Sequence, residues 1–142
     1  MAGNDDQQST STRDLVIRFY HRLWNAWDDA AVENTLAPDL TFRGSLGETA
    51  VGLNGWRGYR DHIRCNAPDF HSEVLDLLSA DDQAAARCRF TGTHHGPILG
   101  IPATGRPFSY TGAAFFTSSR GLITSIWALG DLDALRRQLK ST

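Results

Sequence analysis

Several features that would assign this chain to a specialised class of protein are scarce or missing in its sequence. It has only two cysteines, Cys65 and Cys88, which are far apart. Two isolated cysteines define neither a disulfide framework nor a zinc site, so we expect a reduced, cytoplasmic protein. No apolar run approaches the roughly 20 residues that a membrane span requires, so no membrane partner is expected.

Positive charge is not concentrated anywhere in the sequence. The 14 Lys and Arg residues are balanced by 16 Asp and Glu residues, which gives a formal net charge of -2. A protein that binds nucleic acid needs a concentrated basic face, so this class of function is excluded. The hydrophobic share of 41% is that of an ordinary globular protein.

The domain organisation is predicted to be simple. Residues 1–10 are polar and contain neither the positive start nor the apolar stretch of a signal peptide, so we expect a disordered lead-in. Residues 11–142 are predicted to form a single domain, because a chain of this length can bury one core and shows no internal repeat.

Helices are predicted from the three- and four-residue spacing of apolar side chains. Ser11 or Thr12 is a suitable N-cap for the first helix, which runs through Trp27. A short second helix is expected from Asp28 to Leu36 and ends before Pro38. The third and fourth predicted helices span residues 55–65 and 131–139.

The pattern changes to that of β-strands after Phe70. Helices first and antiparallel strands later indicate an α+β domain and not a series of βαβ units. We expect a curved antiparallel sheet wrapped around the N-terminal helices, with a conical pocket for a small apolar ligand. The predicted strands are residues 40–43, 72–78, 84–94, 108–117 and 122–129.

One long motif lies between two of the predicted strands. Residues 92–106 read GTHHGPILGIPATGR, and shorter matching pieces are LAPDL at 36–40 and PDF at 68–70. This pattern resembles that of the SnoaL-like polyketide cyclases, with the signature GTHxGxxxGxPxTGR, from about Leu15 to Leu139. The resemblance implies a cone-shaped α+β barrel of the NTF2-like superfamily that binds an aromatic polyketide.

The family includes aldol cyclases and cofactor-independent hydroxylases that act at C-1 of anthracycline precursors. The resemblance places the acid/base Asp of the cyclases at Ala128 and its assisting His at Ala114. Neither alanine can move a proton, and a positioned general base contributes about 10²–10⁴ in rate. The chain is therefore most similar to the hydroxylase branch, and we expect a cofactor-independent monooxygenase.

No cofactor is expected. The sequence has no G-x-G-x-x-G after a strand, no haem-type cysteine context and no facial triad of two His and a carboxylate. A hydroquinone-like polyketide, reduced by a separate reductase, would itself supply the electrons. Two alternatives remain open: an aldol cyclase that uses another base, Asp131 or His94, and a non-catalytic protein that binds an apolar aromatic ligand.

Candidate site residues follow from the resemblance and from side-chain chemistry. Arg43 would pair with an anionic intermediate, His62 would act as an acid or a base, and Asp131 would accept a proton unless it only caps the last helix. Each of these three also has a purely structural alternative, and together they form the predicted catalytic set. The predicted substrate-binding residues are Trp24, Tyr59, His94, Tyr110, Ala114 and Ala128.

The outer side of the sheet is expected to be partly apolar. In the expected alternation the outward positions include residues on the last two strands. An exposed apolar patch of this kind predicts a homodimer formed through the sheet. The expected outward residues are Ala113, Phe115, Ile123, Ser125 and Trp127.

Overall fold

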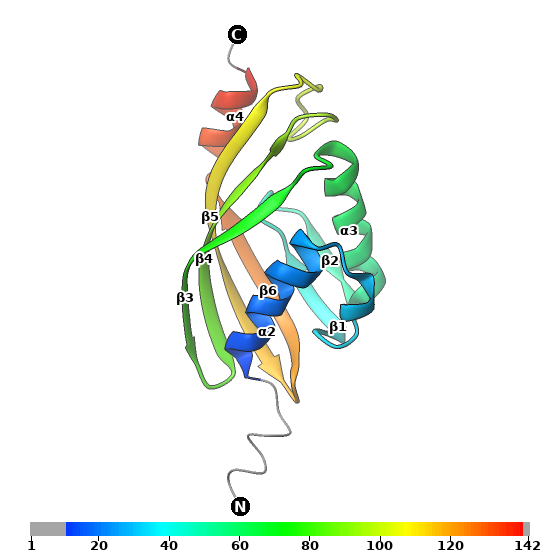
Figure 1. Cartoon of the computed structure of the whole chain (residues 1–142), viewed down its shortest axis with the longest axis vertical. Coiled ribbons are helices and arrows are strands. Elements are labelled where there is room, and N and C mark those ends of the chain that lie inside the picture. Colours follow the sequence, from blue (N-terminus) through cyan, green and yellow to red (C-terminus); the bar gives the residue numbers. More distant parts are fainter. Residues whose placement is uncertain (1–10, 141–142) are drawn as a thin grey trace, which may run out of the picture.

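A computed structural model describes residues 11–140 of the chain, and the predicted lead-in of residues 1–10 lies outside this range. The described part is a strongly curved sheet whose concave side is covered by helices, and a further helix packs against one end of the sheet (Figure 1). The α+β class predicted from the sequence is confirmed. The sheet has six strands and is open, so the cone is closed by helices and loops and not by strand pairing.

The first helical segment is continuous but changes geometry part-way. Helix α2 spans Thr12–Arg18, and the hydroxyl of Ser11 caps it by accepting a hydrogen bond from Asp14 N at 3.1 Å. The chain continues as a π-helix, η1, over Phe19–Asn25, which turns a cluster of aromatic side chains toward the sheet. The predicted N-cap is therefore confirmed.

The second predicted helix is wrong over most of its length. A short 3₁₀ turn, η2, covers Asp29–Ala31 and is capped by Asp28, whereas strand β1 already begins at Leu36 and runs through Arg43. Pro38 lies inside this strand. The pairing of β1 with β6 is irregular between Leu36 and Thr41. The proline, which has no backbone N–H, is tolerated there because it interrupts no regular series of hydrogen bonds between the strands.

The strands form one sheet in the order β2-β1-β6-β5-β4-β3. All neighbouring pairs are antiparallel except β1 and β6. The remaining elements are β2 (Thr49–Val51), α3 (Gly52–Asn66), β3 (His71–Ala80), β4 (Gln83–Thr93), β5 (Pro107–Ser119), β6 (Leu122–Gly130) and α4 (Leu132–Lys140). Helix α3 lies over β1 and β2, and α4 packs on β5.

Side chains alternate along β5 and β6 as predicted, with one exception. Ala114 and Ala128 face each other across the β5–β6 pair, and both are buried. The expectation that Ile123 points outward is wrong, because it is fully buried. The cause is an irregularity after Thr117 that shifts the β5–β6 register by one residue and reverses the alternation.

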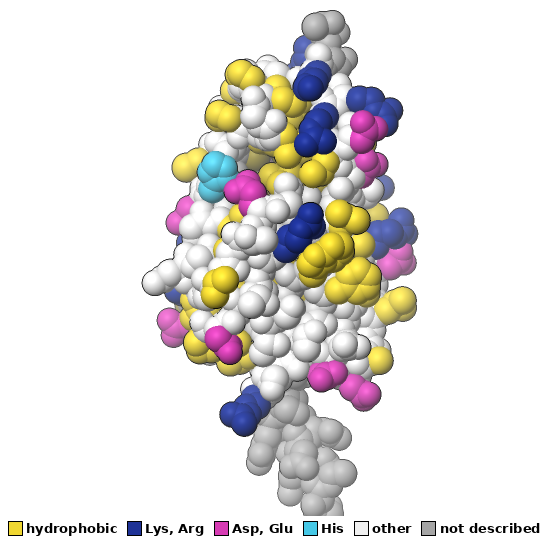
Figure 2. Space-filling view, turned by 180° about the vertical axis from the view of Figure 1, so that it is seen from behind, with side chains coloured by type: hydrophobic (Ala, Val, Ile, Leu, Met, Phe, Trp, Pro, Cys, Tyr) yellow, Lys and Arg dark blue, Asp and Glu magenta, His cyan; other side chains and the backbone are white. Residues whose placement is uncertain are grey.

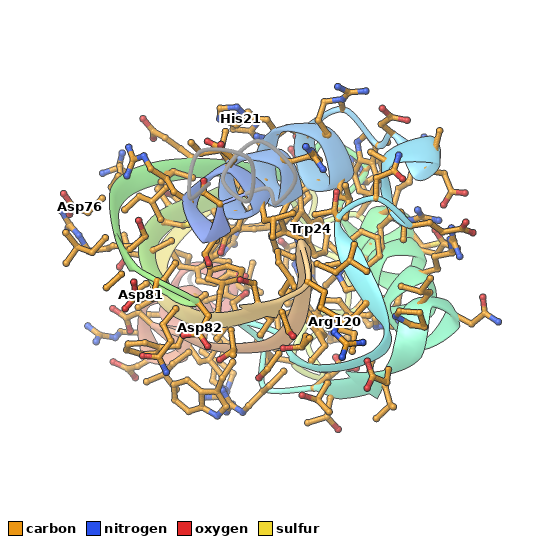
Figure 3. The ribbon with its side chains drawn as sticks, turned by 90° about the horizontal axis from the view of Figure 1, so that it is seen from below. His21, Trp24, Asp76, Asp81, Asp82 and Arg120 are labelled. Carbon is orange, nitrogen blue, oxygen red and sulfur yellow. The ribbon has the colours of Figure 1, made fainter. Side chains whose placement is uncertain are left out.

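The core lies between the concave side of the sheet and the helices. Phe19 packs edge-on against Phe116 of β5 with ring centroids 5.8 Å apart, and Trp24 packs against Trp56 of α3 at 5.6 Å. Viewed from below in Figure 3, Trp24 points into this interior, whereas His21 and Asp76 lie at the periphery. Aromatic packing therefore joins η1, α3 and the sheet in one core.

The outer side of the sheet carries an exposed apolar patch, visible in Figure 2 as hydrophobic side chains gathered over the strands. We define the outer patch as Phe115, Trp127 and Leu129, which are 56%, 45% and 53% exposed. The rings of Phe115 and Trp127 lie 6.2 Å apart. In residues 11–140 no helix is both long and apolar enough to cross a membrane.

Candidate active site

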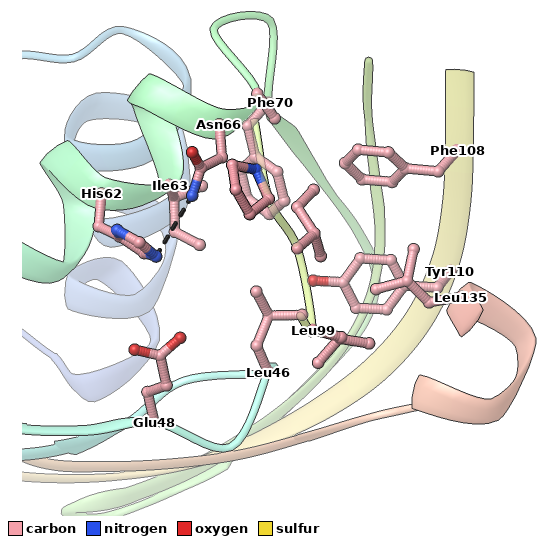
Figure 4. Close-up of a pocket in the computed structure, with 13 residues that line it drawn as sticks. Leu46, Glu48, His62, Ile63, Asn66, Phe70, Leu99, Phe108, Tyr110 and Leu135 are labelled. Carbon is pink, nitrogen blue, oxygen red and sulfur yellow. Dashed lines mark hydrogen bonds between the residues drawn. The ribbon is translucent and has the colours of Figure 1, made fainter. Parts of the chain in front are cut away.

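The concave interior contains two small cavities. The outer pocket opens between α3, the β1–β2 loop and the β4–β5 loop, as Figure 4 shows. The inner cavity lies deeper, between η1 and the sheet, and Phe70 contributes to the walls of both. Each cavity has a volume of about 30 Å³, close to the space that one water molecule occupies in the liquid.

The mouth of the outer pocket carries the polar groups of the site. His62 comes from α3 and lies near Glu48, which follows the β1–β2 turn (Figure 4). His62 Nε2 is 3.2 Å from the side-chain nitrogen of Asn66, one helical turn further on. An amide nitrogen only donates, so Nε2 is the acceptor and the neutral imidazole carries its proton on Nδ1. His62 is exposed, so it can exchange protons with solvent.

Two hydroxyl groups are paired where the two cavities meet. Tyr110 of β5 lines the outer pocket, Ser45 of the β1–β2 loop lines the inner cavity, and Tyr110 Oη is 2.8 Å from Ser45 Oγ. Both side chains are buried. Burial raises the pKa of the Tyr110 phenol well above its ordinary value, more than the hydrogen bond with Ser45 lowers it. The phenol therefore stays protonated and can donate a hydrogen bond at neutral pH.

The inner cavity is lined almost entirely by aromatic and small side chains. Trp24, Tyr59 and Ala128 are among its walls. Burial raises the pKa of Tyr59, whose hydroxyl lies against Gly44 so closely that a side chain at that position would overlap it. Along the inward positions of β4, β5 and β6, a stretch that the structure describes completely, there is no carboxylate and no imidazole.

Two residues of the predicted catalytic set lie outside both cavities. Arg43 follows the inward Phe42, so it points to the outer side of the sheet, where its guanidinium stacks over Trp127 at 5.0 Å and donates to the carbonyl of Ala128. Asp131 is exposed and caps α4 by accepting from Ala134 N at 3.1 Å. Neither Arg43 nor Asp131 therefore lines either of the two cavities, and Asp131 has the helix-capping role that was its structural alternative; a catalytic role for either residue stays a prediction.

His94 also lines neither cavity, and its predicted contact with substrate stays a prediction. It is fully buried at the end of β4, and both ring nitrogens bond to the β4–β5 loop. Ala114 is buried and faces inward, but only Ala128 of this pair borders a cavity.

The structure brings together part of the predicted set and adds residues that sequence reasoning missed. His62 and Tyr110 share the outer pocket, and Trp24, Tyr59 and Ala128 share the inner cavity. The missed polar residues are Ser45, Glu48 and Asn66. Ser45 and Glu48 lie in a Gly-rich loop, and nothing in the sequence pattern indicates that this loop turns back over β5.

The side chains of the described part of the chain do not gather in a way that would hold a metal ion. No group of three or more His, Cys, Asp or Glu residues with suitable geometry occurs among residues 11–140. The expectation that no metal takes part in the reaction stays a prediction.

The family model for SnoaL-like polyketide cyclases matches residues 14–139, which is nearly the whole described domain. The chain belongs to the SnoaL-like polyketide cyclase family. Among curated protein sequences, no relative matches it. The conical α+β architecture and the apolar interior described above are therefore those of a family fold.

Several solved structures are similar to this family member. TsrD from Streptomyces laurentii is 32% identical, with a TM-score of 0.79, 91% of this chain covered and 94% of that one. IdmH from Streptomyces antibioticus, a candidate polyketide cyclase, is 28% identical, with a TM-score of 0.77 and coverage of 92% and 99%. AclR from Streptomyces galilaeus, a candidate hydroxylase, is 21% identical, with a TM-score of 0.75 and coverage of 92% and 85%. At that identity the likeness to AclR shows the fold alone.

Proposed function

We propose that this protein is a cofactor-independent hydroxylase of an aromatic polyketide in the biosynthesis of an anthracycline-type antibiotic. One observation carries the proposal: Ala114 and Ala128, opposite each other on the inward side of β5 and β6, are the positions to which the resemblance assigns the proton-transferring pair of the cyclases. Methyl side chains there remove the groups that ring closure needs. The apolar interior for an aromatic ligand is retained.

The paired hydroxyls of Tyr110 and Ser45 are suited to hold an anionic oxygen of the substrate. A phenol with a raised pKa donates a hydrogen bond without giving up its proton. Preorganised donors in a pocket shielded from water stabilise developing negative charge more strongly than water does. A substrate phenolate would replace one of the two hydroxyl partners in the 2.8 Å contact.

His62 is placed to remove the proton that creates this anion. Its Nε2 lone pair points to Asn66 at 3.2 Å, a contact that a substrate hydroxyl can take over. An exposed imidazole at the mouth can pass the proton on to solvent. Glu48 lines the same pocket and lies near His62 (Figure 4).

The oxidation balances without a cofactor if the substrate enters as a hydroquinone. The anion transfers electrons to O₂, and a C–O bond forms at the ring carbon to give a hydroperoxide. Cleavage of its O–O bond releases one oxygen as water and leaves the other in the new hydroxyl group. Two electrons come from the hydroquinone, which becomes a quinone, and two from the C–H bond; a separate reductase would regenerate the hydroquinone state.

A second candidate function is aldol cyclisation, as the name of IdmH suggests for that protein. It is favoured by the presence of a base, His62, and a hydrogen-bond donor, Tyr110, in one pocket, since these two groups can also form and hold an enolate. The two reactions share the first proton transfer and differ in what the anion then attacks.

One pair of incubations separates these functions. The purified protein is given an aromatic polyketide in its hydroquinone form with a reductase and ¹⁸O₂, and separately a methyl-ester polyketide under argon. We expect one labelled oxygen in a new phenol from the first and no ring closure in the second. Ring closure without oxygen would contradict the hydroxylase, and binding with no turnover in either would indicate a carrier. Flavin or metal in the purified active protein would contradict the cofactor-free mechanism.

We also propose that two copies associate through the outer patch. The exposed Phe115, Trp127 and Leu129 form an apolar surface beside the charged Arg43, which stacks on Trp127. Trp127→Glu should shift the mass measured by light scattering from dimer to monomer, whereas Leu78→Glu, at an exposed leucine of β3, should not. A monomeric wild-type protein would contradict this proposal.

A further inference from the structure

The outer pocket is small for the fused-ring ligand that it is proposed to bind. A volume of about 30 Å³ is roughly a tenth of that of the smallest ordinary ligand pockets, so part of the wall has to move when a ligand of fused rings enters. Three of the wall residues, Pro97, Ile98 and Leu99, come from the β4–β5 loop, which is an irregular segment between two long strands.

The tip of the loop is a tight turn with an unusual residue. Ile98 and Ile101 form an isolated bridge, with N–H···O distances of 3.1 and 2.9 Å in the two directions. The two residues between them, Leu99 and Gly100, have φ values of 52° and 75°. Glycine adopts this left-handed conformation freely, whereas the side chain of a leucine makes it strained. The strain brings a large apolar side chain into the pocket wall.

His94 holds this turn in place from behind. Thr104 N donates to His94 Nδ1 at 3.3 Å, so Nδ1 is the acceptor and the proton is on Nε2, which donates to the carbonyl of Ile101 at 3.1 Å. The Thr104 hydroxyl lies 3.0 Å from the same Nδ1. The backbone of His94 also pairs with Gly105 and Arg106 at 2.9 Å each. One buried imidazole thus connects both arms of the loop to β4.

The other end of the loop is attached to α3. The carbonyl of Asn66 accepts hydrogen bonds from His95 N at 2.8 Å and Gly96 N at 3.0 Å. Gly96 is required because a Cβ there would lie 3.1 Å from the Cα of Asn66 and closer still to its side chain. The loop is therefore fixed at its base by Asn66 and His94, and its tip, Leu99 and Gly100, is the segment between these attachments that borders the pocket.

We propose that Leu99 sets the upper size limit of the ligand and that His94 is the positioning residue that keeps Leu99 at the pocket wall. The inference rests on the proposed function only in that the outer pocket is the ligand site. It gives neither His94 nor Leu99 a role in catalysis. A ligand with more fused rings has to displace the Leu99 side chain further than a smaller one does.

The test compares two probes by calorimetric titration, 1-naphthol with two rings and 1,8-dihydroxyanthraquinone with three. Leu99→Ala should raise the affinity for the larger probe relative to the smaller by about tenfold, because a few methylene groups in a pocket change discrimination by that order. Arg120→Gly is the matched control: it removes a left-handed side chain with φ 54°, but in the β5–β6 turn away from the pocket. It should leave the ratio unchanged.

Two further variants test the positioning role. Thr104→Val removes the hydroxyl contact to His94 at an exposed position, and His94→Gln keeps a donor that can reach the carbonyl of Ile101. We expect Thr104→Val to shift the probe ratio toward that of Leu99→Ala and His94→Gln to shift it less than His94→Ala. The thermal unfolding temperature of each variant shows whether a shift comes from the loop or from global unfolding.

The outcomes are distinguishable from a failure of the proposed function, because binding is measured without turnover. An unchanged probe ratio in Leu99→Ala overturns the inference even if labelled oxygen is incorporated by the wild type. A shifted ratio in a protein that incorporates no oxygen supports the inference and contradicts the hydroxylase. A shift of the same size in Arg120→Gly would also overturn it.

Discussion

The outer pocket and the inner cavity have the same volume but different chemistry. The outer pocket combines His62, Glu48 and Asn66 at its mouth with the Tyr110 hydroxyl inside, whereas the inner cavity is bounded mainly by rings and small side chains. The inner cavity is lined by Ala128, the position to which the family resemblance assigns the acid/base Asp of the cyclases. The comparison indicates that in this chain the polar chemistry lies on the loop and α3 side of the interior, and the sheet side provides apolar surface.

The strongest test of this difference is the removal of the base at the mouth. His62→Gln should lower turnover by about 10²–10⁴, with little change in stability, because His62 is exposed and makes one side-chain hydrogen bond. The measurement is steady-state oxygen consumption with substrate. His21→Gln, at an exposed histidine of η1, is the control and should stay within about twofold of wild type. Equal turnover by His62→Gln and His21→Gln would show that the polar groups at the mouth of the outer pocket take no part in the reaction.

A second test compares the two buried phenols. Tyr110→Phe should lower turnover by about 10²–10³ through loss of a donor to the substrate anion. It should also lower the free energy of unfolding by about 1–3 kcal/mol, since the buried Ser45 hydroxyl loses its partner. Tyr59→Phe makes the same change in the inner cavity and should leave turnover within about threefold. The reverse order of the two effects would place the chemistry in the inner cavity.

A third test fills the inner cavity. Ala128 lines the inner cavity, and Phe70 lines both the inner cavity and the outer pocket. Ala128→Leu places a larger side chain in the inner cavity, and this overpacking should lower the free energy of unfolding by about 1–3 kcal/mol. If fused rings extend from the outer pocket into this space, affinity for a three-ring ligand should fall by about tenfold and that for a two-ring ligand should not. Titration of both ligands into Ala128→Leu and wild type checks this. Equal losses would show that the ligand stays in the outer pocket.

The smallest expected effect is a change in stability caused by Asp69. This residue directly precedes Phe70, which lines both cavities. Asp69 accepts hydrogen bonds from Thr93 N and Oγ1, each at 2.7 Å. Partial burial by itself raises the pKa of Asp69, but these two hydrogen bonds lower it overall. The contribution to stability is therefore present above about pH 4, the ordinary value for Asp, and is lost as the pH falls through the lowered pKa.

Urea unfolding at pH 7 and pH 3 checks this sign. Asp69→Asn should be less stable than wild type at pH 7, and the difference should be smaller at pH 3, which is below the ordinary pKa of an Asp carboxyl. Asp76→Asn, whose carboxylate is paired with Arg87 at the exposed end of β3, is the control. A difference that grows toward low pH would contradict the assigned direction of the pKa shift.

Most of the fold was predictable because it depends on local periodicity. The strands after Phe70 and the last two helices occur where the sequence pattern places them, within a few residues at each end. The segment from Asp28 to Leu36 was not, because the helical spacing of a few apolar residues does not show that Leu36 begins a strand paired in parallel with β6. The start of β1 at Leu36 is determined by its pairing with β6, a segment far away in the sequence.

Part of the candidate site was predictable: Trp24, Tyr59 and His62 on the helices line the cavities, and in the sheet strand parity decides the direction of each side chain. Tyr110, Ala114 and Ala128 face inward as alternation requires, whereas Arg43 follows the inward Phe42 and so points outward. Ile123 shows the limit of the same rule, because a one-residue shift of register reverses the direction of its side chain. Such irregularities leave no mark in the sequence pattern.

The sequence by itself determined the family, the α+β class, the apolar character of the interior and the substitution of alanines at positions 114 and 128. These follow from residue types and spacing, which act locally along the chain. Only the tertiary structure decided that His62 and Tyr110 border one pocket, that Ser45 pairs with Tyr110, and that His94 holds the β4–β5 loop. These contacts join segments far apart in the chain, and their geometry depends on how the loops pack over the sheet.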